Sequence, residues 1–257
     1  MSLIPFSLEL DTVFHKFDAA AIGLMTGGTL GMKYERLADI GSLDTVLKTC
    51  TRYFKPQVGD VLVLNDPYSG GHLLSAMFFV APVFANVALV VKMELKPNLS
   101  LKSHMDEEGL RIPPTPIVQK GVIQTDLIDA IQTHPKAQLD WKPRVEKTLR
   151  DVLHVVGVLQ RFPKKVKRWE DSLGPSEQRL NHTLSEFPHG ETKIEKKFPT
   201  GELLKLHLSV EKSGLQLDFS GSSKAVMMGI PEHVVYGASA GAFAAFLKWK
   251  ESLNRHE

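Results

Sequence analysis

One short loop gathers the side chains of this sequence that are best suited to chemistry. It carries an amide, a carboxylate, two hydroxyls, an imidazole and two glycines, in the order Asn65, Asp66, Pro67, Tyr68, Ser69, Gly70, Gly71 and His72. A histidine can act as a general base or as a metal ligand when a carboxylate orients it, so His72 and Asp66 are the candidate catalytic residues. The same residue types also make an ordinary turn, and this plain structural interpretation stays open.

The loop is expected to connect two buried strands. Short runs of β-branched and aromatic residues lie at 60–64, 77–84 and 87–95, and Gly, Pro and Asn residues bound them. Such runs are typical of buried strands that pair in one sheet. The residues between the first two runs therefore form a loop that is fixed on two core strands, where polar side chains can be held in position.

Helical and hairpin patterns surround these strands. Residues 18–36 predict a hairpin around two glycines, and a helix with Ser42 as its N-cap is expected to follow. The periodicity is helical from 126 to about 184. A single apolar stripe in this stretch comprises Val145, Leu149, Val152, Leu153, Val156 and Leu159. A second hairpin over 204–219 and a helix over 234–247, rich in small residues, complete the pattern.

This order of elements predicts an α+β fold. We expect a mixed, mainly antiparallel sheet, with packed helices inserted between two groups of strands. The expected organisation is a single domain over 1–257. Its parts are a sheet-rich region (1–120), a helical region (121–190) and a hairpin with a terminal helix (191–257).

The composition argues against nucleic acids and membranes as binding partners. The 257 residues carry a net charge of +2 and are 43% hydrophobic, the balance of a globular protein and not of one that binds nucleic acid or an anionic membrane. No apolar run approaches the roughly 20 residues of a membrane-spanning helix. Cys50 is the only cysteine, which excludes an intramolecular disulfide and leads us to expect a cytoplasmic protein. Its apolar neighbours at helical spacing predict a core position for this thiol.

Three separate blocks, in order, resemble the hydantoinase B family, which includes 5-oxoprolinase and the acetone carboxylase α subunit. They lie at 59–73, at 108–114 with the following Lys120-Gly121, and at 217–223, and the resemblance covers roughly residues 18–235. It implies action on cyclic amides such as hydantoins or 5-oxoproline, with ATP supplied through a separate A subunit. It also implies that His and Asp residues of the first region bind a divalent metal ion.

The resemblance places further residues among the candidates for ligand binding. The complete set of these is Asn65, Tyr68, Ser69, Gly70, Gly71, Ser75, Asp218 and Ser220. The family pattern continues past the Gly-Gly loop as Thr-His-x-x-Asp, and a later strand carries His-His-x-Asp. Here His72 keeps the first histidine position, Ser75 stands where the aspartate is expected, and the strand at 87–95 has no histidine. A serine hydroxyl is a poor ligand for a divalent ion, so we expect a degenerate metal site with His72 as its remaining ligand.

Two functional hypotheses remain open on this basis. The first is a diverged, shortened relative of the family's amino-terminal half, a pseudoenzyme that is non-catalytic or weakly active. The second is an ATP-dependent hydrolase of cyclic amides that acts with a hydantoinase A-like subunit, since the sequence lacks a Gly-x-x-x-x-Gly-Lys element of its own. No cofactor is certain, and a divalent metal ion is the one candidate. Besides an A-like subunit, a homo-oligomer formed through the helix at 234–247 is an alternative partner.

Overall fold

A computed structural model describes most of the chain. The described residues are 13–95, 109–137, 140–171, 188–199, 201–211, 214–224 and 231–253, with positions 178, 182, 185 and 186, and the side chains of 244–253 are not described. The chain divides into two compact units, one formed by residues 171–229 and the other by residues 3–170 and 230–257. The larger unit contains the candidate loop.

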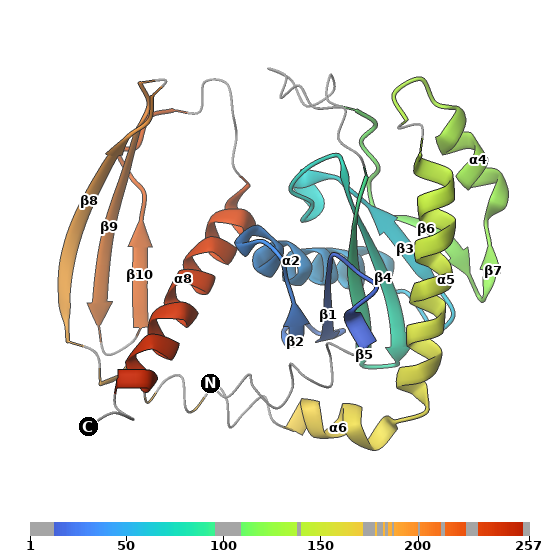
Figure 1. Cartoon of the computed structure of the whole chain (residues 1–257), viewed down its shortest axis with the longest axis horizontal. Coiled ribbons are helices and arrows are strands. Elements are labelled where there is room, and N and C mark those ends of the chain that lie inside the picture. Colours follow the sequence, from blue (N-terminus) through green and yellow to red (C-terminus); the bar gives the residue numbers. More distant parts are fainter. Residues whose placement is uncertain are drawn as a thin grey trace. The chain divides into compact units, whose positions relative to one another are not determined.

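A seven-stranded sheet is the centre of the larger unit (Figure 1). Its order is β2-β1-β5-β4-β3-β6-β7, and every neighbouring pair is antiparallel. The strands are β1 (Ala19–Leu24), β2 (Thr29–Lys33), β3 (Val61–Leu64), β4 (Ala76–Phe84), β5 (Val87–Glu94), β6 (Thr115–Gln119) and β7 (Val122–Ile123). The hairpin around the two glycines and the three buried strands of the prediction are confirmed, as is the α+β class.

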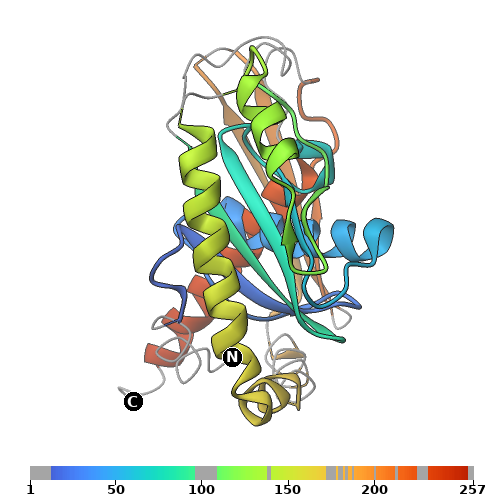
Figure 2. The same ribbon diagram turned by 90° about the vertical axis from the view of Figure 1, so that its right-hand side faces the viewer.

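Alternation along the strands gives the sheet two buried faces, each covered by helices. On one face, Leu89 and Val91 of β5 belong to the same core as α5, and Figures 1 and 2 show this helix lying along the sheet. On the opposite face, Ala88 and Val90 pack in a second core with α2. The helices are α2 (Leu37–Phe54), α4 (Thr125–Thr133), α5 (Trp141–Gln160), α6 (Pro163–Asp171) and α8 (Glu232–Leu253). None of the described helices is both long and apolar enough to cross a membrane.

The apolar stripe predicted for the helical region is largely confirmed. Five of its residues are buried in α5, whereas Leu153 is 37% exposed and lies off the buried face. The predicted helical periodicity continued to about 184, but α6 ends at Asp171 and most of 172–184 lies outside the described residues. Cys50 is fully buried on α2, as its neighbours predicted.

The start of α2 corrects one prediction. Ser42 was expected to cap this helix, but α2 begins five residues earlier, at Leu37, and Ser42 is buried inside it. The carboxylate of Asp39 accepts hydrogen bonds from the backbone N–H groups of Arg36 at 2.9 Å and Glu35 at 3.3 Å. An acidic side chain in the first turn therefore stabilises the helix start, and it also interacts favourably with the positive end of the helix dipole.

Helix α8 packs against α2 within the same unit. The contact is close because glycines face each other: a Cβ atom on Gly41 would lie 1.7 Å from the carbonyl oxygen of His233, and one on Gly237 would lie 2.5 Å from the amide nitrogen of Gly41. Glycines of the terminal helix are thus used in packing within the chain.

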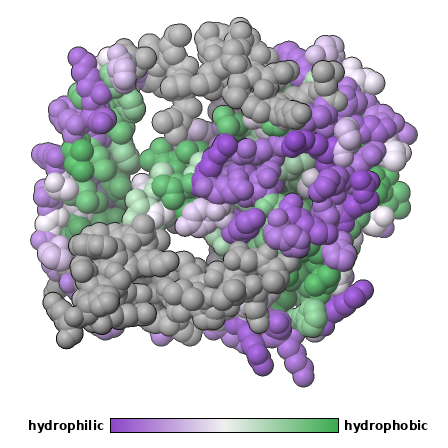
Figure 3. Space-filling view, viewed as in Figure 1, coloured by the Kyte–Doolittle hydropathy of each residue, from purple (hydrophilic) through white to green (hydrophobic). Residues whose placement is uncertain are grey.

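The smaller unit contains a three-stranded antiparallel sheet in the order β10-β9-β8. Its strands are β8 (Gly190–Lys197), β9 (Leu203–Glu211) and β10 (Gly214–Asp218). The hairpin of β9 and β10 is confirmed, while β8 was not predicted because charged residues dominate it and it lacks an apolar period. Figure 3 shows hydrophobic residues gathered over this sheet and hydrophilic residues along its edge.

Candidate functional site

The polar residues at the start of the loop hold the loop itself. The side-chain amide of Asn65 donates to the carbonyl oxygens of Leu74 at 2.7 Å and Leu110 at 2.9 Å, and its oxygen accepts from the N–H of Ile112 at 2.6 Å. This buried side chain thereby joins both ends of the loop to the segment before β6. Such a fully used amide fixes the loop and leaves no group for a ligand.

Asp66 is likewise used within the loop. Its carboxylate accepts hydrogen bonds from the N–H of Tyr68 at 3.1 Å and the hydroxyl of Ser69 at 3.0 Å, and so caps the short 3-10 helix Pro67–Ser69 (η1). Tyr68 is 82% exposed, with the guanidinium of Arg111 6.0 Å from its ring centroid. The expected pairing of Asp66 with His72 is therefore replaced by local capping.

The two glycines bring the loop against α2. Gly70 has φ of 108°, and a Cβ atom there would lie 2.6 Å from the amide nitrogen of Val46. A Cβ atom on Gly71 would lie 2.3 Å from the carbonyl oxygen of Asn65. The carbonyl oxygen of Gly71 also accepts a hydrogen bond from the His233 ring at 2.9 Å. Only glycine allows this close approach, which carries the next residue, His72, onto the helix.

His72 is buried against the amino-terminal half of α2. Its Nδ1 lies 3.2 Å from the hydroxyl oxygen of Ser42, and its ring meets Phe78 edge-on, with 5.6 Å between the centroids. Its Nε2 is buried, has no hydrogen-bond partner among the described residues, and lies 3.9 Å from Oδ1 of Asp39. Burial lowers the pKa of His72 to about 4, although the nearby Asp39 carboxylate works in the opposite direction. The imidazole is therefore neutral at physiological pH.

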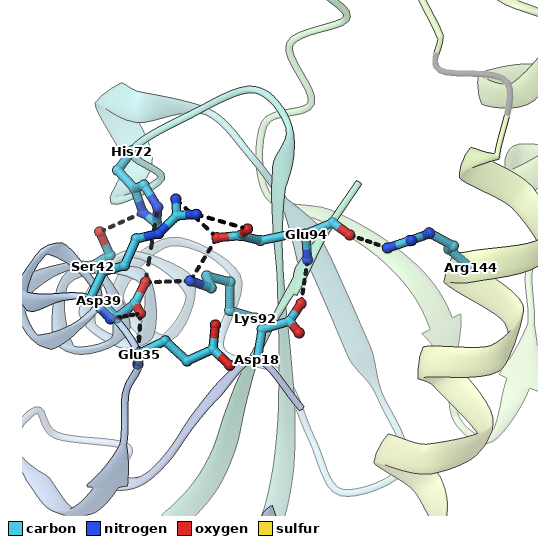
Figure 4. Close-up of polar contacts among 9 residues, drawn as sticks. Asp18, Glu35, Asp39, Ser42, His72, Lys92, Glu94 and Arg144 are labelled. Carbon is cyan, nitrogen blue, oxygen red and sulfur yellow. Dashed lines mark hydrogen bonds and ion pairs between the residues drawn. The ribbon is translucent and has the colours of Figure 1, made fainter. Parts of the chain in front are cut away.

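Beside His72 lies a group of four charged residues that we call the ionic cluster: Arg36, Asp39, Lys92 and Glu94 (Figure 4). The Nζ atom of Lys92 lies 2.7 Å from Oδ1 of Asp39 and 3.0 Å from Oε1 of Glu94. The guanidinium of Arg36 pairs with both carboxylate oxygens of Glu94, at 3.1 and 3.2 Å. Lys92 and Asp39 are completely buried. Two positive and two negative charges balance, which makes burial of the inner pair tolerable.

The alternation of β5 explains why a lysine is buried here. Ala88, Val90 and Lys92 follow one another on the α2 face, so the lysine continues an apolar row and reaches the start of the helix, where Asp39 lies. The backbone of Glu94 is fixed on both sides, because its N–H donates to Asp18 at 2.7 Å and its carbonyl oxygen accepts from the guanidinium of Arg144. The backbone that carries the Glu94 carboxylate is thus fixed beside the ammonium group.

The remaining predicted residues make local contacts. The carbonyl oxygen of Ser75 accepts the N–H of Leu95 at 2.8 Å, which joins the loop to the end of β5. Asp218 accepts the N–H of Ser220 at 2.8 Å in a local turn of the smaller unit. Sequence reasoning missed Asp39, because the helix was expected to begin after it, and it missed Lys92. The available signal was a lysine inside an otherwise apolar strand.

The groups around His72 do not fit a divalent metal ion. Among the described residues, no group of three or more His, Cys, Asp and Glu side chains is placed to hold one. His72 supplies an imidazole beside the ionic cluster, and both nearby carboxylates are occupied by ammonium or guanidinium groups. A divalent ion needs several oxygen or nitrogen ligands that converge on one point, and here an ammonium group already lies between the two carboxylates.

Comparison with known proteins adds the family context. The sequence profile of the hydantoinase B/oxoprolinase family matches residues 18–255. An uncharacterized protein of Methanocaldococcus jannaschii is 23% identical over 259 residues, which is 91% of this chain and 46% of that protein.

Two solved structures share the fold. The ATP-dependent caprolactamase of Pseudomonas jessenii superposes with a TM-score of 0.74 at 18% identity, over 91% of this chain and 47% of that one. Nucleotide-free acetone carboxylase superposes with a TM-score of 0.63 at 12% identity, over 84% and 34%. The chain thus spans about half the length of the archaeal relative and of the caprolactamase chain.

Proposed function

Because the chain belongs to the hydantoinase B/oxoprolinase family, we propose that it is a family subunit with a degenerate metal site. In this proposal it is non-catalytic or at most weakly active, and it acts through its fold and its contacts with a partner. Both compact units together form one hydantoinase B-like domain. The single observation that carries the proposal is the buried Lys92 ammonium, which lies 2.7 Å from Asp39 and 3.0 Å from Glu94.

The charge of the cluster supports this proposal. A divalent cation placed beside the Lys92 ammonium would meet strong repulsion in a region of low effective dielectric, where charges 4 Å apart interact by about 4 kcal/mol even at an effective dielectric constant of 20. The carboxylates of Asp39 and Glu94 are already neutralised by Lys92 and Arg36. The cluster therefore works as a rigid, charge-balanced support for the His72 loop.

The partner in this proposal is a hydantoinase A-like subunit, and a second copy of the chain is the alternative. Family membership supports the first, because A and B chains act together in the enzymes that the sequence resembles. Cys50 is a buried free thiol, and a reducing compartment keeps such thiols in the reduced form, so we place the assembly in the cytoplasm.

One observation favours the alternative function, an ATP-dependent hydrolase of cyclic amides of the hydantoin or 5-oxoproline type. His72 is neutral and its Nε2 has no hydrogen-bond partner among the described residues, which are properties of a general base. Ser42, whose hydroxyl oxygen lies 3.2 Å from Nδ1, would then orient the ring in place of Asp66. Against this, the side chain of His72 is only 6% exposed, so a substrate could reach it only after a rearrangement of the loop.

Metal content and turnover separate the two functions. The protein is purified without chelators, analysed for bound metals, and assayed with ATP and an A-like subunit on hydantoin, 5-oxoproline and caprolactam. We expect trace metal only and no turnover, with complex formation that is the same for wild type and His72→Ala. Turnover that His72→Ala abolishes and His154→Ala preserves would reject the proposal, since His154 is an exposed histidine on α5.

A further inference from the structure

The ionic cluster surrounds its lysine in the way that ligands surround a metal ion. Lys92 is completely buried, and two carboxylate oxygens lie within 3.0 Å of its Nζ atom. His72 lies beside one of these carboxylates: its buried Nε2, which has no hydrogen-bond partner among the described residues, is 3.9 Å from Oδ1 of Asp39. Figure 4 shows these side chains converging from α2, from the loop and from β5.

We propose that the Lys92 ammonium takes the place of a divalent cation, and that removal of this side chain turns Asp39, Glu94 and His72 into a metal-binding site. This inference rests on the proposed function, in which the native protein holds no metal. It goes further because it names Lys92 as the residue that replaces the cation, and names the three side chains that would bind an ion in its absence.

Among the described residues no three such side chains are placed to hold an ion, so binding requires the ligands to move once the lysine side chain is gone. Ligand oxygens lie about 2.0–2.2 Å from a bound zinc ion, so for an ion at the position of Nζ the carboxylates of Asp39 and Glu94 would move inward by about 0.5–1.0 Å from their distances of 2.7 and 3.0 Å. Two ligand atoms of a tetrahedral zinc site are about 3.3 Å apart, close to the 3.9 Å between His72 Nε2 and Asp39 Oδ1. Water would complete the coordination, entering through the space that the lysine side chain leaves.

The charge balance favours the same result. Without Lys92, the buried Asp39 carboxylate has no full positive charge beside it, while Glu94 keeps its pairing with Arg36. A buried carboxylate in this state is strongly destabilising, and binding of a cation removes the destabilisation. Metal binding and folding of the variant are therefore coupled.

The test compares Lys92→Ala with wild type in titrations with Zn²⁺ alone and Mn²⁺ alone, by calorimetry and by thermal unfolding. We expect Lys92→Ala to bind one equivalent at least tenfold more tightly than wild type and to gain thermal stability on binding. Adding Asp39→Asn to the variant removes the gain. Lys142→Ala is the matched control, because Lys142 also lies between two carboxylates, Asp129 and Glu146, but on the surface.

Several results would overturn the inference. The inference fails if Lys92→Ala binds the ion no more tightly than wild type does. It also fails if binding by Lys92→Ala persists after Asp39→Asn is added, or if Lys142→Ala shows the same gain in affinity. If Lys92→Ala is unfolded when purified alone, we expect either ion to restore its fold, and we expect the second variant, Lys92→His, which brings its own imidazole, to bind one equivalent. Failure of both variants would also overturn it.

The outcome for wild type separates this inference from the proposed function. A stoichiometric ion in wild type that Asp39→Asn removes would contradict the proposed function. A wild type free of metal together with a Lys92→Ala variant free of metal would leave the proposed function intact and reject only the role of Lys92 as a cation substitute.

Discussion

Acidification should weaken the folded state through His72. Burial lowers the pKa of this side chain from 6.5 to about 4, while Asp39 and Glu94 raise it and Lys92 and Arg36 lower it further. In the unfolded chain the ordinary value applies, so between pH 6.5 and about 4 the unfolded state binds more protons than the folded state. The stabilisation is complete above pH 6.5 and is lost as the pH falls towards 4.

The difference between the two pKa values sets the size of the effect. At about 1.4 kcal/mol per pKa unit, full protonation across this window corresponds to about 3 kcal/mol. At pH 5, which is below 6.5 but above 4, the expected loss is about 2 kcal/mol relative to pH 7.5. Because the side chain of His72 is only 6% exposed, solvent screening reduces this figure little.

Denaturant unfolding at pH 7.5 and pH 5 measures the effect. The variant is His72→Asn, whose amide can still reach the hydroxyl of Ser42. We expect wild type to lose about 2 kcal/mol more than this variant between the two pH values. His154→Asn, which replaces an exposed histidine, should lose as much as wild type. Equal losses in wild type and His72→Asn would refute the reasoning, and so would an NMR titration of His72 with a midpoint near 6.5.

Three further results are expected. The first is a double-mutant cycle measured by denaturant unfolding, in which Lys92→Met alone should lower the free energy of unfolding by about 3–5 kcal/mol. The double variant with Asp39→Leu should lose at least about 1 kcal/mol less than the sum of the two single losses, and additive losses would contradict a buried ion pair. Gly41→Ala should destabilise the protein by about 1–3 kcal/mol or more, because its Cβ atom would meet the backbone of α8. Gly157→Ala is the control: its Cβ atom would lie in open space, so this change should be neutral or stabilising by up to about 1 kcal/mol. Similar effects of the two changes would argue against the packing of α8 on α2. Cys50, whose pKa burial raises to about 12, should react with a thiol reagent only after unfolding, and rapid reaction of the native protein would show that the α2 face opens.

Local patterns predicted those parts of the fold that depend on neighbours in the sequence. The buried strands were evident because a strand covered on both faces is almost entirely apolar: β4 has no charged residue, and β5 has only Lys92 and Glu94 near its end. The start of α2 was misplaced because Ser42 has a good N-cap side chain, whereas the true start depends on an acidic residue in the first turn. Strand β8 was missed because all its residues are exposed, so its sequence carries no burial pattern.

The candidate site could be predicted only in part, since it is built by long-range contacts. His72 was recognised from its loop, but its partner Asp39 precedes it by 33 positions and Lys92 follows Asp39 by 53. Asp39 and Lys92 meet because β5 lies between β1 and β4 inside the sheet and α2 packs against it, which depends on the strand order and not on local sequence.

The position of Lys92 also shows what a search for ligands alone overlooks. The strand at 87–95 contains none of the expected imidazoles, and yet the buried carboxylates beside it still need a positive charge. The ammonium of Lys92, on this same strand, supplies that charge without any ion, at the cost of burying a lysine that must always stay paired. A lone lysine or arginine in an apolar strand is therefore informative when expected ligands are absent. In this chain it accounts for the fact that the Asp39 carboxylate can remain completely buried beside a neutral histidine.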